Sequence, residues 1–199
     1  MREDAPYILV DLEQGSEAWH EWRRHGIGAS EAPTIMSENP WKTADELLEM
    51  RRGLQKRKPA TKSMALGSAL EPEARRAFEI EIGEAMSPIC VQSVKFEWMR
   101  ASLDGMAWDE SRVVEIKCGA RVYQETAMFR RVPRQYFAQL QHILAVTGLG
   151  EIDFWSFWPE CCPVHLRVPR NEQYIRRLIA IEELFWGKIV QEKSKGKEC

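Results

Sequence analysis

A carboxylate and a Glu-x-Lys pair lie close together in the middle of this chain. Asp104 precedes the apolar run Val113–Cys118, in which Glu115 and Lys117 occupy alternate positions. Successive side chains of a strand point to opposite faces, so we expect Glu115 and Lys117 to share one face while their neighbours point into a sheet. Together with Asp104 they supply two carboxylates and one ammonium group.

Such a set suits the metal-dependent hydrolysis of phosphodiesters. One or two Mg²⁺ ions about 4 Å apart can activate a water, stabilise the charge that develops on the phosphate and assist the leaving oxygen. Mg²⁺ prefers oxygen ligands and retains several waters. The candidate ligands are Asp104, Glu115 and the Ile116 carbonyl, with Glu71 as a third carboxylate. We expect a neighbouring metal to lower the pKa of Lys117, which would then orient or deprotonate the attacking water.

The same residues also have a plainer interpretation. Glu-x-Lys on a strand is typical of a solvated face that carries a weak ion pair. The dipeptide Asp104-Gly105 is typical of a turn. The spacing alone therefore leaves both a catalytic site and a solvated strand open.

Hydrophobic periodicity predicts the elements that must position these residues. The first predicted helices cover 17–24, capped by Ser16, and a brief stretch from Ala29 that stops near Asn39-Pro40. Further helices are predicted over 43–52, over 63–82 with a kink or restart at Pro72, over 134–147 and over about 172–193, capped by Asn171. Predicted strands cover 86–96, 99–103, 113–118, 152–158 and 164–168. We expect one α/β domain over residues 1–199, with a small mixed central sheet flanked by helices and with residues 193–199 frayed.

Composition restricts the class of protein. A formal net charge of −2 excludes a uniformly basic coat protein, so any contact with DNA must come from a local patch. Five cysteines without a Cys-x-x-Cys pair favour free thiols over a disulfide framework or a zinc site. Residues 1–6 lack an apolar signal core, and no apolar stretch reaches about 18 residues. We therefore expect a soluble, intracellular protein.

Several segments, in order along the chain, resemble the motifs of the lambda-type (YqaJ-like) alkaline exonucleases of the PD-(D/E)XK nuclease superfamily. They are Gly15–Arg23 with Ile27–Glu31, Leu66-Gly67-x-x-Leu70-Glu71, Leu103-Asp104-Gly105, Glu115–Cys118 and Gln139-Leu140-Gln141. One departure is Leu103, which stands where the family signature has a proline that is not a ligand. The resemblance implies a restriction-endonuclease-like core.

The resemblance also implies the roles of individual residues in a metal site. Asp104, Glu115 and the Ile116 carbonyl would bind Mg²⁺, with Mn²⁺ as an alternative, and Glu71 would hold a second ion. Lys117 would position the nucleophilic water. A further residue, Gln139, would support the site from its helix.

Arg23, Ser30 and Ser102 resemble the family's pocket for a 5′-phosphate. This role is physically reasonable, because a guanidinium group donates in a fork to phosphate oxygens and Ser30 lies near a predicted helix N-terminus. The plainer alternatives are that Arg23 is one of two adjacent surface arginines and that Ser30 is an N-cap.

Two further positions resemble contacts to the duplex. Met64 matches a position at which the family inserts an apolar wedge into the duplex end, and core packing is the alternative. Lys62, like the basic cluster Lys56–Lys58, is a candidate for contact with backbone phosphate, and a solvated loop is the alternative.

By this resemblance the chain would be a Mg²⁺-dependent 5′-to-3′ exonuclease. It would degrade one strand of linear duplex DNA from a 5′-phosphorylated end and leave a 3′ tail for phage-type recombination by strand annealing. A homotrimeric ring in the cytoplasm of a bacterial or phage-infected host cell would pass this tail to a single-strand annealing recombinase. Two alternatives stay open: an endonuclease of restriction or repair type, and a catalytically silent DNA-binding module of the same fold.

Overall fold

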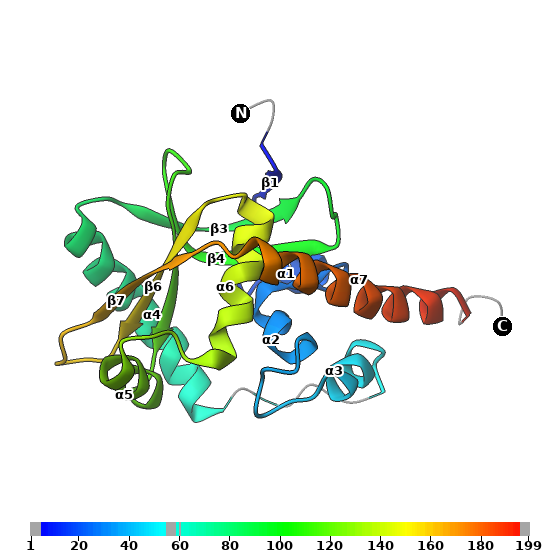
Figure 1. Ribbon diagram of the computed structural model, residues 1–199, viewed down its shortest axis with the longest axis horizontal. Helices are drawn as coiled ribbons and strands as arrows, with labels where there is room; N and C mark the ends of the chain where they lie inside the picture. The colour runs from blue at the N-terminus through cyan, green and yellow to red at the C-terminus, as the bar shows by residue number, and fades with distance from the viewer. Residues whose placement is uncertain (1–4, 55–58, 60, 196–199) are drawn as a thin grey trace.

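The computed structural model describes residues 5–54, 59 and 61–195 as a central sheet with helices on both sides (Figure 1). The strands are β1 Tyr7–Val10, β2 Ile27–Gly28, β3 Met86–Ser93, β4 Met99–Ala107, β5 Val113–Cys118, β6 Glu151–Phe157 and β7 Val164–Pro169. The helices are α1 Glu17–Arg24, the 3₁₀ helix η1 Ala29–Glu31, α2 Ala32–Ile35, α3 Ala44–Arg51, α4 Lys62–Ile82, α5 Ala120–Phe129, α6 Arg134–Thr147 and α7 Glu172–Lys195. The predicted fold class, a mixed sheet flanked by helices, is confirmed.

The sheet contains seven strands, and six of them follow the order β1-β3-β4-β5-β6-β7. β5 and β6 are parallel, and the chain between them forms a crossover through α5 and α6. The short strand β2 is also parallel to its partner β4. The other pairs are antiparallel. The crossover brings α6 back to the strand that carries Glu115 and Lys117.

β4 and β5 pair only near the hairpin that joins them, at Gly105 with Val114 and at Met106 with Val113. β3 pairs with the opposite edge of β4. The short strand β2 therefore pairs with the same edge as β5, but at Met99 and Arg100, near the beginning of β4. Between these two pairings, β4 and β5 diverge. We call this divergence the fork; it begins at Asp104 of β4 and Glu115 of β5, where the two strands are no longer paired.

The two faces of the sheet are covered by different helices. α6 packs Leu140, Ile143 and Leu144 into a large cluster on one face. On the opposite face, Phe78 of α4 makes an edge contact with the ring of Trp155, with centroids 5.2 Å apart. β5 is therefore buried on both faces, as expected for an internal strand with a parallel partner.

Several elements differ from the sequence-based predictions. β1, β2 and α5 were not predicted, and β4 continues beyond residue 103 to Ala107. Helix α4 runs through Pro72 without a restart. The predicted N-cap of the last helix is confirmed, because Asn171 Oδ1 accepts a hydrogen bond from Tyr174 N–H at 2.9 Å. That helix continues to Lys195, past the predicted onset of fraying, and residues 196–199 lie outside the described residues.

The Asp104-Gly105 dipeptide is part of strand β4 and not a turn. A Cβ atom at Gly105 would lie 2.8 Å from Val114 Cγ1 and 2.9 Å from Met86 Cβ. Glycine is needed here because β3, β4 and β5 are close-packed at the base of the fork. None of the helices in the described ranges is long and apolar enough to cross a membrane.

We predict that Gly105→Ala destabilises the fold by about 1–3 kcal/mol, because the added methyl group must push apart two neighbouring strands. Gly150→Ala is the matched control, since no atom lies within 4 Å of a Cβ built there. Urea unfolding followed by circular dichroism measures both variants. Equal stability of the two would contradict the close packing at Gly105.

Candidate active site

The fork between β4 and β5 is closed by a side chain and not by the sheet ladder. Asp104 Oδ2 accepts a hydrogen bond of 2.7 Å from the Ile116 N–H. Asp104 lies on β4 and Ile116 on β5, so the carboxylate takes the place of a strand-to-strand bond. A backbone donor that would lack a partner is thereby satisfied, and Asp104 is oriented toward β5.

Glu115 is the most buried carboxylate of this region, with 1% of its surface exposed. Its Oε1 atom accepts from Lys117 Nζ at 2.5 Å and from Gln139 Nε2 of α6 at 2.6 Å. The other atom, Glu115 Oε2, is buried and has no hydrogen-bond partner among the described residues. One oxygen therefore orients the carboxylate, while the second is available to a cation.

Lys117 lies on the same face of β5 as Glu115, as alternation predicted. Its ammonium group lies 5.1 Å from the ring centroid of Tyr136 on α6. Sequence reasoning missed Tyr136, although its position three residues before Gln139 places both on one side of the helix. Gln139 was predicted from the resemblance, and the structure brings it to Glu115.

The lower pKa expected for Lys117 depends on a neighbouring metal ion, and it stays a prediction for the ion-bound protein. Burial by itself would lower the pKa of Lys117, but the nearby carboxylates of Glu115 and Asp104 outweigh it and raise the value. Lys117 is therefore an ammonium group at neutral pH. In this state it can donate a hydrogen bond to a water or a phosphate oxygen.

Glu71 approaches the fork from α4. The helix lies close to β5 because position 67 is glycine: a Cβ there would be only 3.2 Å from the Cys118 carbonyl oxygen. Glu71 Oε1 accepts from Arg75 Nη2 at 2.5 Å, and Arg75 Nε donates to the Asp104 carbonyl oxygen at 2.5 Å. Sequence reasoning missed Arg75, although its position four residues after Glu71 is the spacing of helical ion pairs.

All three carboxylates of this site have a raised pKa. Burial is the largest cause for each of them. The pKa of Glu115 is raised to about 7 by burial and by the charge of Asp104, and that of Glu71 by burial and again by Asp104. Burial also raises the pKa of Asp104, despite the opposing influence of Lys117. Burial thus destabilises the ionised carboxylates, and the nearby cations Lys117 and Arg75 offset this only in part.

This donor set fits a divalent cation that prefers oxygen ligands. Asp104 and Glu115 carry the charge, and the unpartnered Glu115 Oε2 is an orphaned acceptor of the kind a cation would satisfy. The described residues contain no group of three His, Cys, Asp or Glu side chains already arranged to hold an ion. Glu71 is paired with Arg75, and so the predicted ligands do not all converge.

The three residues predicted to bind a 5′-phosphate are brought together by Trp19 of α1. Trp19 Nε1 donates to Ser102 Oγ on β4 at 2.8 Å. The Arg23 guanidinium carbon lies 4.5 Å from the centroid of the Trp19 ring, and Arg23 Nη2 donates to Ser30 Oγ at 2.8 Å. Sequence reasoning did not assign Trp19 a role. The three polar groups therefore form one cluster, held by an aromatic platform.

The turn between α1 and β2 holds this cluster in place. A Cβ at Gly28 would lie 3.0 Å from Arg23 Nη2, so glycine allows the guanidinium group to approach the backbone. Arg51 of α3 donates to the carbonyl oxygens of Arg23 and Gly26. Ser30 is the middle residue of η1 and not its N-cap, which is Gly28. The plainer interpretation of Ser30 is therefore wrong.

The two candidate duplex contacts lie at the beginning of α4. Lys62 is the first residue of this helix and not part of a loop, and Thr61 is its N-cap. Met64 is 61% exposed, so the alternative that it packs in the core is wrong. The basic cluster 56–58 lies outside the described residues.

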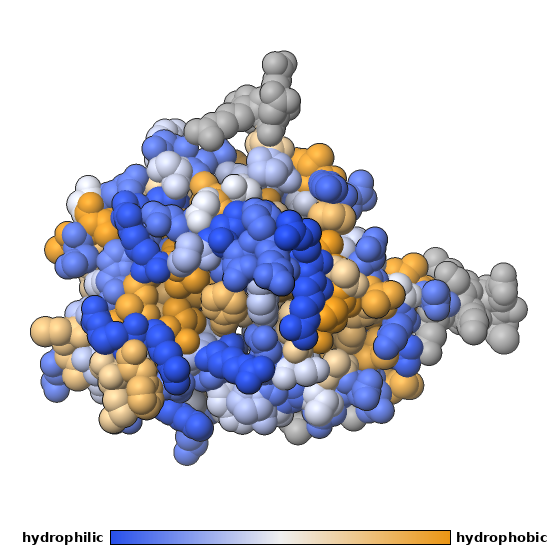
Figure 2. Space-filling view, in the orientation of Figure 1, coloured by the Kyte–Doolittle hydropathy of each residue, from blue (hydrophilic) through white to orange (hydrophobic). Residues whose placement is uncertain are grey.

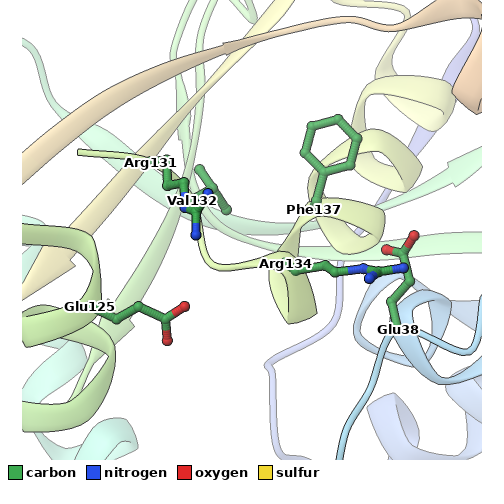
Figure 3. A pocket seen from close by; sticks show the side chains of 6 residues that line it. All are labelled: Glu38, Glu125, Arg131, Val132, Arg134 and Phe137. Atoms are coloured by element: carbon green, nitrogen blue, oxygen red, sulfur yellow. The ribbon is translucent and has the colours of Figure 1, made fainter. Parts of the chain in front are cut away.

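A separate cavity of about 410 Å³ lies between the start of α6, α5 and the loop after α2. Figure 3 shows the Arg134 side chain extending toward Glu38, with Glu125 and Arg131 on the opposite side and Phe137 above. Hydrophilic side chains gather on this part of the face in Figure 2, with hydrophobic ones between them. The cavity contains none of the carboxylates of the fork, so we assign the site from its geometry and not from cavity size.

Comparison with known proteins identifies relatives of this chain. Residues 18–150 match the family described as YqaJ-like viral recombinase domain. The protein YqaJ of Bacillus subtilis (strain 168) is 28% identical over 150 residues, which cover 72% of this chain and 46% of that protein. The chain thus spans about half the length of this relative.

Two solved structures share the fold. The alkaline exonuclease LHK-Exo from Laribacter hongkongensis superimposes with a TM-score of 0.80 at 23% identity, over 92% of this chain and 97% of that one. A phage related exonuclease from Haemophilus somnus 129PT gives a TM-score of 0.64 at 11% identity, over 85% and 96%. The central sheet and its flanking helices are therefore those of an alkaline exonuclease fold.

We predict that Glu115 makes the stability of the ion-free protein depend on pH. Its pKa is about 7 in the folded protein, against 4.5 as the ordinary value. At pH values between these two pKa values, Glu115 keeps its proton in the folded protein but has lost it in the unfolded chain. The free energy of unfolding is therefore greatest at the acid end of this pH range and falls as the pH rises.

Glu115→Gln should reduce this fall in the free energy of unfolding by about 1–3 kcal/mol, because the amide is neutral at every pH in the range. Urea unfolding in EDTA at several pH values measures the effect, and exposed Glu81→Gln is the control. Parallel pH curves for wild type and Glu115→Gln would contradict the prediction.

Proposed function

Because this chain belongs to the family of YqaJ-like viral recombinase domains, we propose that it is a Mg²⁺-dependent exonuclease acting on DNA, with Mn²⁺ as an alternative ion. The whole carboxylate site, from Glu71 to Gln139, lies inside the matched region 18–150. The observation that carries the proposal is the buried Glu115 carboxylate. It is oriented by Lys117 and Gln139 and has one unsatisfied oxygen at a fork lined by Asp104.

In the proposed reaction each side chain has a separate task. Asp104 and Glu115, with the Ile116 carbonyl, would hold the ion, which supplies Lewis acidity toward the phosphate and lowers the pKa of its bound water. Gln139 keeps Glu115 in one orientation through its 2.6 Å hydrogen bond. Lys117 donates to the attacking water or to a phosphate oxygen.

Strand β4 supports the proposal that cleavage begins at a phosphorylated 5′ end. We call Arg23, Ser30 and Ser102 the phosphate cluster. Ser102 of this cluster and Asp104 of the fork are two residues apart on β4, so their Cα atoms are about 7 Å apart. This separation is close to that of neighbouring phosphates along one strand. A terminal phosphate on Arg23, Ser30 and Ser102 would place the next phosphodiester at the carboxylates, which corresponds to removal of one nucleotide at a time.

The start of α4 would contact the end of the duplex. Met64 is an exposed apolar side chain, and Lys62 precedes it by half a turn. Insertion of Met64 would unstack the terminal base pair, while Lys62 neutralises backbone phosphate. One strand would then pass to the fork, and the other would remain as a 3′ single-stranded tail.

The assembly and the cellular partners are also part of the proposal. We propose a homotrimeric ring that encloses DNA, and a single-strand annealing recombinase that takes up the 3′ tail in the cytoplasm of a bacterial or phage-infected cell. The support is the family resemblance of residues 14–146. Light scattering of the purified protein tests the trimer directly.

Digestion of linear duplex DNA labelled at one end tests reaction, polarity and cofactor together. We expect mononucleotide release from 5′-phosphorylated ends in Mg²⁺ and none in EDTA. Lys117→Ala should reduce the rate by about 100-fold or more, because it removes the ammonium group that positions the nucleophile, while binding of duplex DNA is retained. Exposed Lys95→Ala is the control.

Closed circular duplex separates the exonuclease from the alternative endonuclease. Cutting of the circle would refute the requirement for an end. Release of no nucleotide in Mg²⁺ or Mn²⁺ would favour a catalytically silent DNA-binding module.

The phosphate cluster leads to a separate prediction. Arg23→Ala should abolish the preference for 5′-phosphate over 5′-hydroxyl ends, because it removes the guanidinium group that would donate two parallel hydrogen bonds to the phosphate. Arg24→Ala is a matched control, since the adjacent Arg24 pairs with Glu21 on the surface of α1. The ratio of initial rates on the two substrates is the measurement. An unchanged ratio in Arg23→Ala would contradict the assignment.

A further inference from the structure

Arg75 contacts two groups of the carboxylate site at once. Its Nη2 atom donates to Glu71 Oε1, and its Nε atom donates to the carbonyl oxygen of Asp104, each at 2.5 Å. The side chain of Arg75 is 16% exposed and that of Glu71 is 33% exposed. An ion pair on a helix surface would need only the first contact. The second contact fixes the guanidinium group at the strand that carries Asp104.

The charges of the site suggest what this anchored cation does. When ionised, Glu71, Asp104 and Glu115 carry three negative charges, and Lys117 and Arg75 carry two positive ones. One negative charge is left, which one divalent cation more than offsets. A second divalent cation needs further negative charge nearby, as a DNA phosphate would supply.

Arg75 also competes directly for the carboxylate that a second ion would use. A guanidinium–carboxylate bond of this length is charge-assisted and strong. Guanidinium groups bind phosphate with similar geometry. If a DNA phosphate approached the fork, Arg75 could exchange Glu71 for it while keeping its bond to the Asp104 carbonyl.

We propose that Arg75 makes binding of the second metal ion depend on DNA. In the DNA-free protein Arg75 holds Glu71, so one ion binds at Asp104 and Glu115. When DNA is bound, Arg75 turns to a phosphate, and Glu71 is released to a second ion. The proposal rests on the metal site of the proposed function and assigns Arg75 as a positioning residue within it.

Titration calorimetry with Mn²⁺ in the absence of DNA tests the proposal without any measurement of activity. We expect one ion per chain for the wild type. Arg75→Met should bind two, or should bind the second at least about fivefold more tightly, as is typical of coupled sites. In the double variant Arg75→Met/Glu71→Gln, the second ion should be lost again. Arg76→Met, which changes an exposed neighbour on the same helix, should bind one ion like the wild type.

Two further measurements keep the test decisive. Arg75→Lys retains the positive charge beside Glu71, so we expect it to bind one ion. If Arg75→Met does not fold, Arg75→Gln takes its place, because the amide keeps an N–H donor for the Asp104 carbonyl and loses the charge, and it should bind two ions. With a duplex made resistant to cleavage by terminal phosphorothioates, the wild type should gain the second ion, because the DNA phosphates now engage Arg75.

The outcomes distinguish this proposal from the proposed function. A wild type that binds one ion, together with an Arg75→Met variant that also binds only one, would overturn the role of Arg75 and leave the metal site intact. Two ions bound by the DNA-free wild type would overturn it as well. A wild type that binds no divalent cation would instead refute the metal site itself.

Discussion

Burial of the Glu115 carboxylate is the constraint on which the rest of the site depends. A charged group in a protein interior is costly unless it is paired and hydrogen-bonded. Lys117 supplies the pairing from the same strand, and Gln139 supplies the hydrogen bond from α6. Even so, the pKa of Glu115 is raised to about 7 by burial and by Asp104, so the compensation is incomplete. Under the proposed function, the remaining instability of the ionised form would favour binding of a cation.

The topology of the sheet produces this arrangement. Parallel β5 and β6 require a crossover, and the crossover returns α6 to the face on which Glu115 and Lys117 project. On the opposite face, α4 approaches β5 through Gly67 and brings Glu71 and Arg75 to the fork. Asp104 can face β5 because the β4–β5 ladder ends after two residue pairs. Two helices and a broken ladder therefore converge on one strand.

Strand β4 links the fork to the phosphate cluster. Ser102 belongs to the cluster through Trp19, while Asp104 belongs to the fork through Ile116. The two sites thus share one internal strand, so their separation does not depend on loops. Under the proposed function, the spacing of Ser102 and Asp104 on this strand would set the distance between the bound 5′ end and the bond that is cleaved.

The sequence alone determined those features that follow from local periodicity. Strand β5, the shared face of Glu115 and Lys117, helix α6 and the Asn171 cap were all predicted, because alternation and capping depend on residues only a few positions apart. The predicted set of site residues also depended on ordered motifs. Each of those residues lies within or beside an element whose pattern is strong.

Only the tertiary structure decided how these elements meet. Trp19 and Ser102 are 83 residues apart, and Arg75 and Asp104 are 29 apart, so no local pattern reveals either contact. The four-residue strand β1 and the two-residue strand β2 exist through their pairing with β3 and β4. The raised pKa of Lys117 in the ion-free protein could not be predicted from local sequence for the same reason. It depends on the charges that folding collects around the ammonium group, and their positions are properties of the packed chain.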